Sequence, residues 1–166
     1  MQFRSKILFL IALLFVITFT ACMKKEVYPI EPIIKFQEFK RFNNDSAWFI
    51  FTFTDGDGDI GLKASDTTSP FNINGEYYYN FHLQYHEKQN GKFIQPDQSI
   101  PFSYRIPYIT PEAKNKALEG EVIVRIPFAY FDFSSSNDTI KYSAYVYDRA
   151  LHKSNVIETT EMVVIK

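Results

Sequence analysis

The sequence predicts an all-β protein, an immunoglobulin-like antiparallel β-sandwich of about seven strands that follows a signal segment. The first indication is hydrophobic alternation with a period of two, which continues through most of the chain after residue 33. The second is composition, because 17 Phe and 11 Tyr supply the aromatic side chains that strands prefer. The third is the spacing of turn residues, which separates the strand-like runs as turns do in sandwiches.

The N-terminal segment, residues 1–21, has the layout of a secretory signal. A basic start and an apolar run, Ile7 to Phe19, lead through small residues to Cys22. The residues Phe19-Thr20-Ala21-Cys22 resemble the lipobox of bacterial lipoproteins, with Phe in place of the usual Leu. The resemblance implies that Cys22 becomes the first mature residue and is covalently lipidated. The alternative is an ordinary signal peptide with an incidental cysteine, although the lone Cys22 has no cysteine in the chain with which to form a disulfide.

Cleavage before Cys22 divides the mature chain into a lipidated tether, residues 22–32, and one domain, residues 33–166. Removal of 21 residues from 166 leaves 145, which is enough for a single domain with a hydrophobic core. The 18 basic residues fall to 16 against 19 acidic residues, so nucleic acid is not expected as a partner. Two or three acyl chains would hold the protein on a membrane without a spanning segment. We expect an envelope protein anchored in the outer membrane, with either the periplasmic or the surface face possible.

The expected strands are runs of alternating residues between turn signals. They cover residues 33–42, 47–54, 77–87, 92–95, 121–128, 138–148 and 155–165. In the third run, the residues expected to face the core are Tyr79, Phe81, Leu83 and Tyr85, with Asn80 outward. Asn90-Gly91 is a strong short-range signal for a hairpin. The proline-rich connection 96–119 should be irregular, with one helical turn from Thr110 that stops at Gly120.

The most informative stretch is Asp55-Gly56-Asp57-Gly58-Asp59-Ile60-Gly61, which directly follows a strand-like run. Its three carboxylates alternate along the chain and repel one another, and no basic residue lies between them. A hard divalent cation would relieve this repulsion, and Ca²⁺ accepts six to eight oxygen ligands from a flexible loop. We therefore predict a Ca²⁺ site with Asp55, Asp57 and Asp59 as ligands. A solvated acidic turn without an ion is the alternative.

Three further ligands are expected from spacing and topology. In an EF-hand comparison, Gly61 stands at the backbone-carbonyl position and Asp66 at the twelfth position. The loop is not an EF-hand, because Ile60 replaces the required glycine and no helices flank it. Asp148 is the third candidate. The loops after the second and the penultimate strands of an immunoglobulin-like sandwich lie at the same end, so Asp148 should point toward the acidic loop.

A wider resemblance connects these motifs. The lipobox, residues 53–61, Leu118-Glu119-Gly120-Glu121-Val122 and residues 148–155 together resemble small lipoproteins of the Bacteroidota with a DGDGDIG loop. The resemblance covers most of the mature chain. It implies an envelope location and a sandwich fold, and it lends no established activity.

The sequence has no recognisable catalytic constellation, and we expect that the protein is not an enzyme. It lacks a Gly-x-Ser-x-Gly elbow, and nothing pairs the carboxylates of Glu87, Glu119 or Glu121. Zinc is not expected either. His82 and His86 are four residues apart on one strand, roughly 13 Å at the strand rise, which is too far for one ion.

The expected function is a lipid-anchored, Ca²⁺-stabilised binding or structural module of the envelope, with an envelope protein or a glycan as partner. The alternative is a glycan-binding or glycan-processing envelope protein that uses Trp48 and the three tyrosines Tyr77, Tyr78 and Tyr79. A cleft with two carboxyl groups about 5–10 Å apart beside an exposed aromatic would favour the alternative. Strands prefer aromatic residues in any case, so core or sheet positions account better for most of these side chains.

Overall fold

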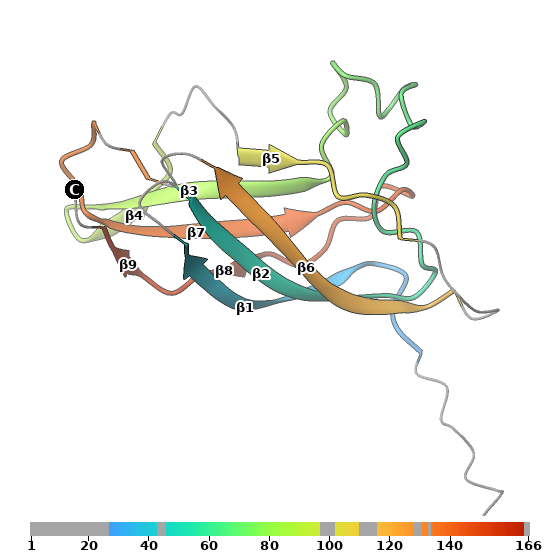
Figure 1. The fold of residues 1–166 in the computed structure, drawn as a ribbon, viewed down its shortest axis with the longest axis horizontal. Helices are drawn as coiled ribbons and strands as arrows, with labels where there is room; N and C mark the ends of the chain where they lie inside the picture. Colours follow the sequence, from blue (N-terminus) through green and yellow to red (C-terminus); the bar gives the residue numbers. More distant parts are fainter. Residues whose placement is uncertain are drawn as a thin grey trace, which may run out of the picture.

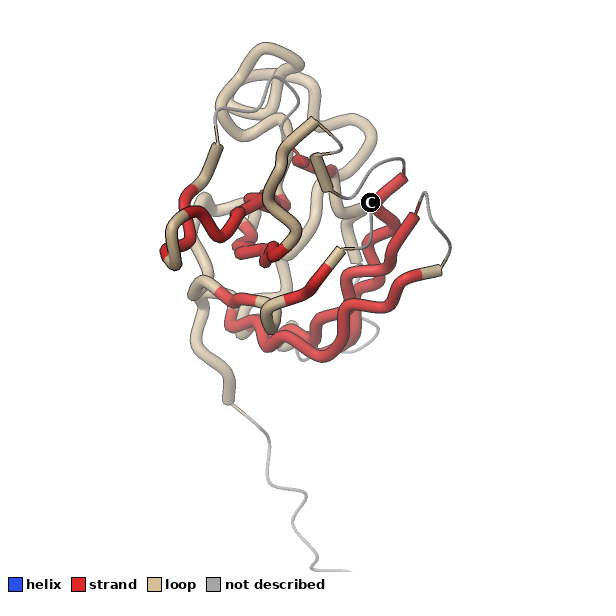
Figure 2. The backbone as a smooth tube through the Cα atoms, turned by 90° about the vertical axis from the view of Figure 1, so that its left-hand side faces the viewer, coloured by secondary structure: helices blue, strands red, loops and turns tan. Residues whose placement is uncertain are grey.

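The computed structural model describes residues 27–42, 46–96, 102–109, 116–127, 131–132 and 134–164. Within these residues the chain forms nine strands and no helix, and the strands make two antiparallel sheets. The sheets lie face to face as a β-sandwich (Figure 1), and Figure 2 shows the two layers after a rotation of 90°. The all-β prediction is therefore confirmed. No helix in the described part of the chain is long and apolar enough to span a membrane.

The first sheet has three strands in the order β1-β2-β6. They are β1 (Ile33–Arg41), β2 (Ser46–Asp55) and β6 (Leu118–Pro127). The register of β1 on β2 shifts between Phe36 and Glu38, as at a β-bulge. β2 lies between the other two strands, so it pairs on both of its edges.

The second sheet has six strands, several of them short. They are β3 (Phe81–Gln89), β4 (Lys92–Ile94), β5 (Phe102–Tyr104), β7 (Thr139–Val146), β8 (Ile157–Glu158) and β9 (Met162–Val163). β3 and β7 pair with each other, β4 and β5 share the other edge of β3, and β8 and β9 share the other edge of β7. β3 and β7 are the inner pair of the second sheet, whereas β2 is the inner strand of the first sheet, with β1 and β6 as its edges among the described strands.

The core between the sheets is aromatic at its centre. Phe51 of β2 stacks on Phe81 of β3, with ring centroids 5.3 Å apart and planes 4° apart, and Phe49 lies 5.8 Å from the Phe81 ring. The predicted inward residues of β7 are also fully buried, namely Ile140, Tyr142, Ala144 and Val146. Burial of one large apolar side chain contributes about 1.5–3 kcal/mol, so the alternating apolar faces fix which side of each strand turns inward.

The predicted hairpin turn joins β3 to β4. Asn90 and Gly91 both have positive φ, 51° and 79°. Those values are the requirement of a two-residue type I′ turn, which explains why this dipeptide is so informative.

The third strand begins later than the alternation predicts. Tyr79 does not face the core, since it is 41% exposed, whereas Asn80, predicted to point outward, is buried. The Asn80 side-chain oxygen accepts a hydrogen bond from the Ile106 N–H at 2.7 Å, and its carbonyl accepts one from the Tyr147 N–H at 2.8 Å. These contacts with distant segments hold a bend before Phe81 and override the local pattern.

Two further boundaries differ from the prediction. Gly120 lies inside β6 rather than before it, and a side chain there would come within 3.1 Å of the Phe53 ring on the paired strand. The predicted last strand, 155–165, is divided into β8 and β9. The predicted helical turn, from Thr110 onward, starts outside the described residues.

Candidate metal centre

The acidic loop begins where β2 ends, because the Asp55 carboxylate organises the turn that follows. Its two oxygens accept hydrogen bonds from the N–H of Gly58 at 3.2 Å and the N–H of Ile60 at 2.7 Å. Gly58 has a φ of 68°, which glycine adopts without steric cost. Asp55 is fully buried, so the inward face of β2 ends in a carboxylate.

Three carboxylates meet in this loop. Asp55, Asp57 and Asp59 each offer one oxygen, and these oxygens lie within 4.8 Å of one another. One oxygen of Asp57 and one of Asp59 are buried and have no hydrogen-bond partner among the described residues. Buried carboxylate oxygens normally have a donor or a cation beside them. The group could therefore hold a metal ion, and it contains three of the six predicted ligands.

The electrostatics of the group also favour a cation. Burial, followed by the contact with Asp57, raises the pKa of Asp55 to about 6, although two N–H groups of the loop oppose the shift. Burial, followed by the charges of Asp148 and Asp57, raises the pKa of Asp59 to about 6 as well. Both carboxylates are thus less favourable in their charged form than in water, and a bound cation would offset that cost.

The turn after β7 lies against the acidic loop, as predicted (Figure 1). Ile60 and Asp148 form an antiparallel bridge, and the Arg149 N–H donates to the Asp59 carbonyl at 3.3 Å. Asp148 is fully buried, and its two oxygens accept hydrogen bonds from the backbone N–H and the Nδ1 of His152, each at 2.8 Å. Asp148 thus lies beside the three-carboxylate group without belonging to it. Its role as a ligand stays a prediction.

The contact with Asp148 shifts the pKa of His152. Hydrogen bonding and the charge of Asp148 raise the pKa of His152 above its ordinary value. Burial raises the pKa of Asp148, and the hydrogen bonds from His152 oppose that shift. The pair therefore places an imidazole, whose charged form Asp148 favours, beside the acidic loop.

Asp66 and Gly61 have partners outside the three-carboxylate group. The Asp66 carboxylate accepts a hydrogen bond from the Lys63 N–H at 2.8 Å and pairs with the Arg149 guanidinium at 3.2 Å. Gly61 has a φ of 86°, and a side chain there would collide with the Pro107 carbonyl. Both residues shape the loop and the segment beside it. Their predicted roles as ligands also stay predictions.

The N-terminal segment contacts the same end of the sandwich, which sequence reasoning missed. The Gly56 N–H donates to the Pro29 carbonyl at 2.8 Å, and a side chain at Gly56 would collide with the backbone there. The Tyr28 hydroxyl donates to Glu119 at 2.6 Å. Part of the predicted tether therefore lies on the domain. The sequence signal for this contact was Gly56, because only a residue without a side chain allows the segment to approach so closely. Cys22 lies outside the described residues.

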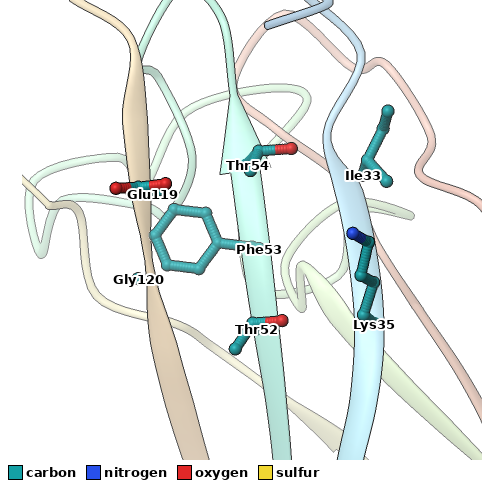
Figure 3. Close-up of a pocket in the computed structure, with 7 residues that line it drawn as sticks. All are labelled: Ile33, Lys35, Thr52, Phe53, Thr54, Glu119 and Gly120. Carbon is teal, nitrogen blue, oxygen red and sulfur yellow. The ribbon is translucent and has the colours of Figure 1, made fainter. Parts of the chain in front are cut away.

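A groove of about 500 Å³ lies on the outer face of the first sheet (Figure 3). Its lining residues are Ile33, Lys35, Thr52, Phe53, Thr54, Glu119 and Gly120. Glu119 is the one carboxylate among these described residues, and Phe53, the one aromatic, is 3% exposed. The groove thus lacks the paired carboxylates and the exposed aromatic that a glycan-processing site requires.

The tyrosines of the glycan alternative pack against other rings. Tyr77 meets Tyr147 at 85° with centroids 5.0 Å apart, and Tyr78 meets Tyr79 at 78°. The Arg105 guanidinium lies over the Tyr78 ring at 5.2 Å. The rings of Tyr77 and Tyr78 are thus partly covered by Tyr147 and Arg105, whereas Tyr79 stays exposed.

A further buried carboxylate lies near the other end of the sandwich. Glu87 is 2% exposed. It accepts four side-chain hydrogen bonds, from Tyr85 at 2.9 Å, Ser135 at 2.8 Å, Asn137 at 3.1 Å and Gln89 at 3.3 Å. Burial raises the pKa of Glu87, but the four hydrogen bonds outweigh burial and leave the pKa below its ordinary value. This carboxylate is fully satisfied by the protein, and no acid or base role follows from its position.

Comparisons of the chain with protein families, with curated proteins and with solved structures find no match. The functional interpretation therefore depends on the geometry of the site and on the sequence motifs.

Proposed function

We propose that this protein is a lipid-anchored binding or structural module of the cell envelope, without catalytic activity, whose acidic loop binds Ca²⁺. The supporting observation is the group of Asp55, Asp57 and Asp59, in which two buried oxygens have no donor among the described residues. Ca²⁺ suits the group better than Mg²⁺. Ca²⁺ accepts variable oxygen geometry from a flexible loop, whereas Mg²⁺ demands a near-ideal octahedron and retains its water.

The proposed anchor places the metal site near the membrane. Tyr28 and Pro29 contact Glu119 and Gly56, so the N-terminal segment leaves the domain at the acidic loop. Tyr28 follows Cys22 by six positions, and even a fully extended chain of that length spans only about 20 Å. A lipid on Cys22 would therefore hold the acidic end toward the bilayer and the opposite end toward a partner.

Ca²⁺ binding is tested by calorimetric titration of the full chain after treatment with EGTA. We expect binding in the wild type, a large loss of affinity in Asp57→Asn, and retention in the matched control Asp138→Asn, an exposed carboxylate near the other end of the sandwich. Mg²⁺ should bind much more weakly. Absence of any Ca²⁺ signal in the wild type would leave the loop as a solvated acidic turn.

The anchor is tested separately by Cys22→Ala. This change removes the proposed lipidation site, so the protein should leave the membrane fraction during an alkaline wash while the wild type stays. A variant that remains with the membranes would contradict the lipoprotein interpretation. It would leave the metal site untouched, because the two tests share no residue.

A further inference from the structure

The two outer edges of the first sheet differ. At β1, the Asn155 side chain occupies the edge at Ile34, because its oxygen accepts the Ile34 N–H at 2.8 Å and its nitrogen donates to the Ile34 carbonyl at 2.9 Å. At β6, the pairing with β2 uses one edge, and no described strand pairs with the other. An unpaired edge presents a row of N–H and C=O groups to another strand.

The outward side chains of β6 follow a symmetrical pattern. Ile123 is 53% exposed, and it is flanked at two residues' distance by the exposed Glu121 and Arg125. Neither charged side chain has a hydrogen bond or ion pair with the described residues. Edge charges of a single sign would repel a second copy of the strand, whereas this arrangement is complementary to itself.

We propose that the free edge of β6 pairs with β6 of a second copy of this chain, in an antiparallel arrangement centred on Ile123. Such a twofold interface uses the same patch on both copies. Ile123 then lies opposite Ile123, and each Glu121 lies opposite the Arg125 of the other copy. The paired region runs from Glu119 to Pro127, where the missing N–H of proline ends the ladder symmetrically.

The neighbouring strand β2 also favours this register. Ile123 pairs with Ile50 of β2, which is 9% exposed, so the apolar contact would continue across four strands of the joined sheet. Other registers that keep the same side chains outward are less favourable. Centres at residue 121 or 125 place like charges opposite each other, and centres at 122 or 124 place Ile123 opposite a charge.

The interface is independent of the proposed Ca²⁺ site and of the lipid. It is tested with the full chain carrying Cys22→Ala, in a detergent that solubilises the N-terminal segment, by sedimentation velocity over a concentration series. We expect reversible dimers. Glu121→Arg and Arg125→Glu should each weaken association by about tenfold or more, because each creates two like-charge pairs. The double exchange Glu121→Arg/Arg125→Glu should restore association, since it rebuilds both ion pairs with the charges swapped.

The matched control is Glu38→Arg, an exposed charge reversal on β1, the opposite edge strand of the same sheet, which should leave association within about twofold. Circular dichroism melts of each variant distinguish weakened pairing from loss of fold. A monomer at all concentrations, or a double exchange that fails to restore association, would overturn the proposal.

Cross-linking tests the register in the same Cys22→Ala background. Ile123→Cys should form an interchain disulfide on mild oxidation, because the two positions face each other directly. Glu121→Cys should not, since the two copies of that residue would be four positions out of register, roughly 13 Å apart. Equal cross-linking at both positions would contradict the proposed alignment.

Discussion

The two ends of the sandwich handle a buried carboxylate in opposite ways. At the hairpin end, Glu87 has four side-chain donors, and the pKa of Glu87 lies below its ordinary value. At the acidic end, Asp55 and Asp59 have pKa values raised to about 6, and two oxygens of the group have no donor among the described residues. Burial is common to both ends, so the neighbours make the difference. Four donors surround Glu87, whereas further carboxylates lie beside Asp55 and Asp59.

The comparison separates a carboxylate that the chain itself satisfies from a group that could hold a metal ion. A carboxylate that the chain itself satisfies stabilises the fold and needs no ion. A carboxylate group that lacks donors costs stability until a cation binds, and that binding energy then adds to the stability of the fold. The hairpin end should therefore respond to mutation in any buffer, and the acidic end should respond through Ca²⁺.

The largest effect is expected at the hairpin end. Glu87→Ala leaves four donors without their acceptor, and each buried unsatisfied group costs about 1–3 kcal/mol. The free energy of unfolding should fall by about 3 kcal/mol or more, equally in EGTA and in Ca²⁺, as measured by urea denaturation. Glu76→Ala, at an exposed loop glutamate, should change it by no more than about 0.5 kcal/mol. If Ca²⁺ restored the unfolding free energy that Glu87→Ala loses, the proposed difference between the two ends would be wrong.

The next effect is a pH dependence of opposite sign at the two ends. Asp55 and Asp59 have folded pKa values above the ordinary 3.8, so the folded state binds protons more tightly than the unfolded state. In EGTA this contribution is complete below pH 3.8 and is lost as the pH rises through about 6. Glu87 behaves in the reverse way, because its stabilisation is complete above pH 4.5 and is lost as the pH falls through its lowered folded pKa.

Urea denaturation at several pH values tests this sign. Without Ca²⁺, the free energy of unfolding should decrease between pH 4.5 and 7 by an amount on the order of 2 kcal/mol. Asp59→Asn should flatten the curve. If the free energy of unfolding instead rises with pH in EGTA, then ionisation of Asp55 and Asp59 does not destabilise the folded state.

A smaller effect is expected at Asp148. Asp148→Asn weakens the two hydrogen bonds with His152 and should cost about 1 kcal/mol of unfolding free energy. It should also weaken Ca²⁺ binding, by less than Asp57→Asn, because it removes a neighbouring negative charge. Calorimetric titration of both variants compares the two effects. An equal loss of affinity would identify Asp148 as a direct ligand.

The smallest global effect is expected at Gly56. Gly56→Ala forces a collision with the Pro29 carbonyl, which should release the N-terminal segment while changing the unfolding free energy by less than about 1 kcal/mol. Hydrogen exchange should show faster exchange of the Gly56 region amides, and limited proteolysis should cleave near Tyr28 sooner. Unchanged protection would mean that this contact does not hold the segment on the domain.

Much of the fold could be predicted because it depends on local patterns. Alternation identified the inward faces of β2 and β7, and Asn90-Gly91 identified the hairpin. The bend before Phe81 could not be predicted in this way. It depends on hydrogen bonds between Asn80 and two distant segments, and these bonds leave no trace in the alternation.

In the candidate site, too, the features set by local spacing could be predicted, and those set by distant contacts could not. The spacing of Asp55, Asp57 and Asp59 was sufficient to bring three oxygens together, since the residues share one short loop. The neighbourhood of Asp148 followed from the topology of the sandwich. The partners of its oxygens, and those of Asp66, depend on side-chain geometry across the loops, which no spacing rule encodes.

The most direct test of the account is the Ca²⁺ dependence of stability at the two ends. Thermal melts of the wild type, Asp57→Asn and Glu87→Gln are recorded in EGTA and in millimolar Ca²⁺. At a Ca²⁺ concentration 100 times the Kd, the wild type should gain about 2.7 kcal/mol. Glu87→Gln should gain the same amount from a lower starting point, and Asp57→Asn should gain almost nothing. Equal wild-type midpoints in the two buffers would contradict the assignment of the acidic end as a Ca²⁺ site.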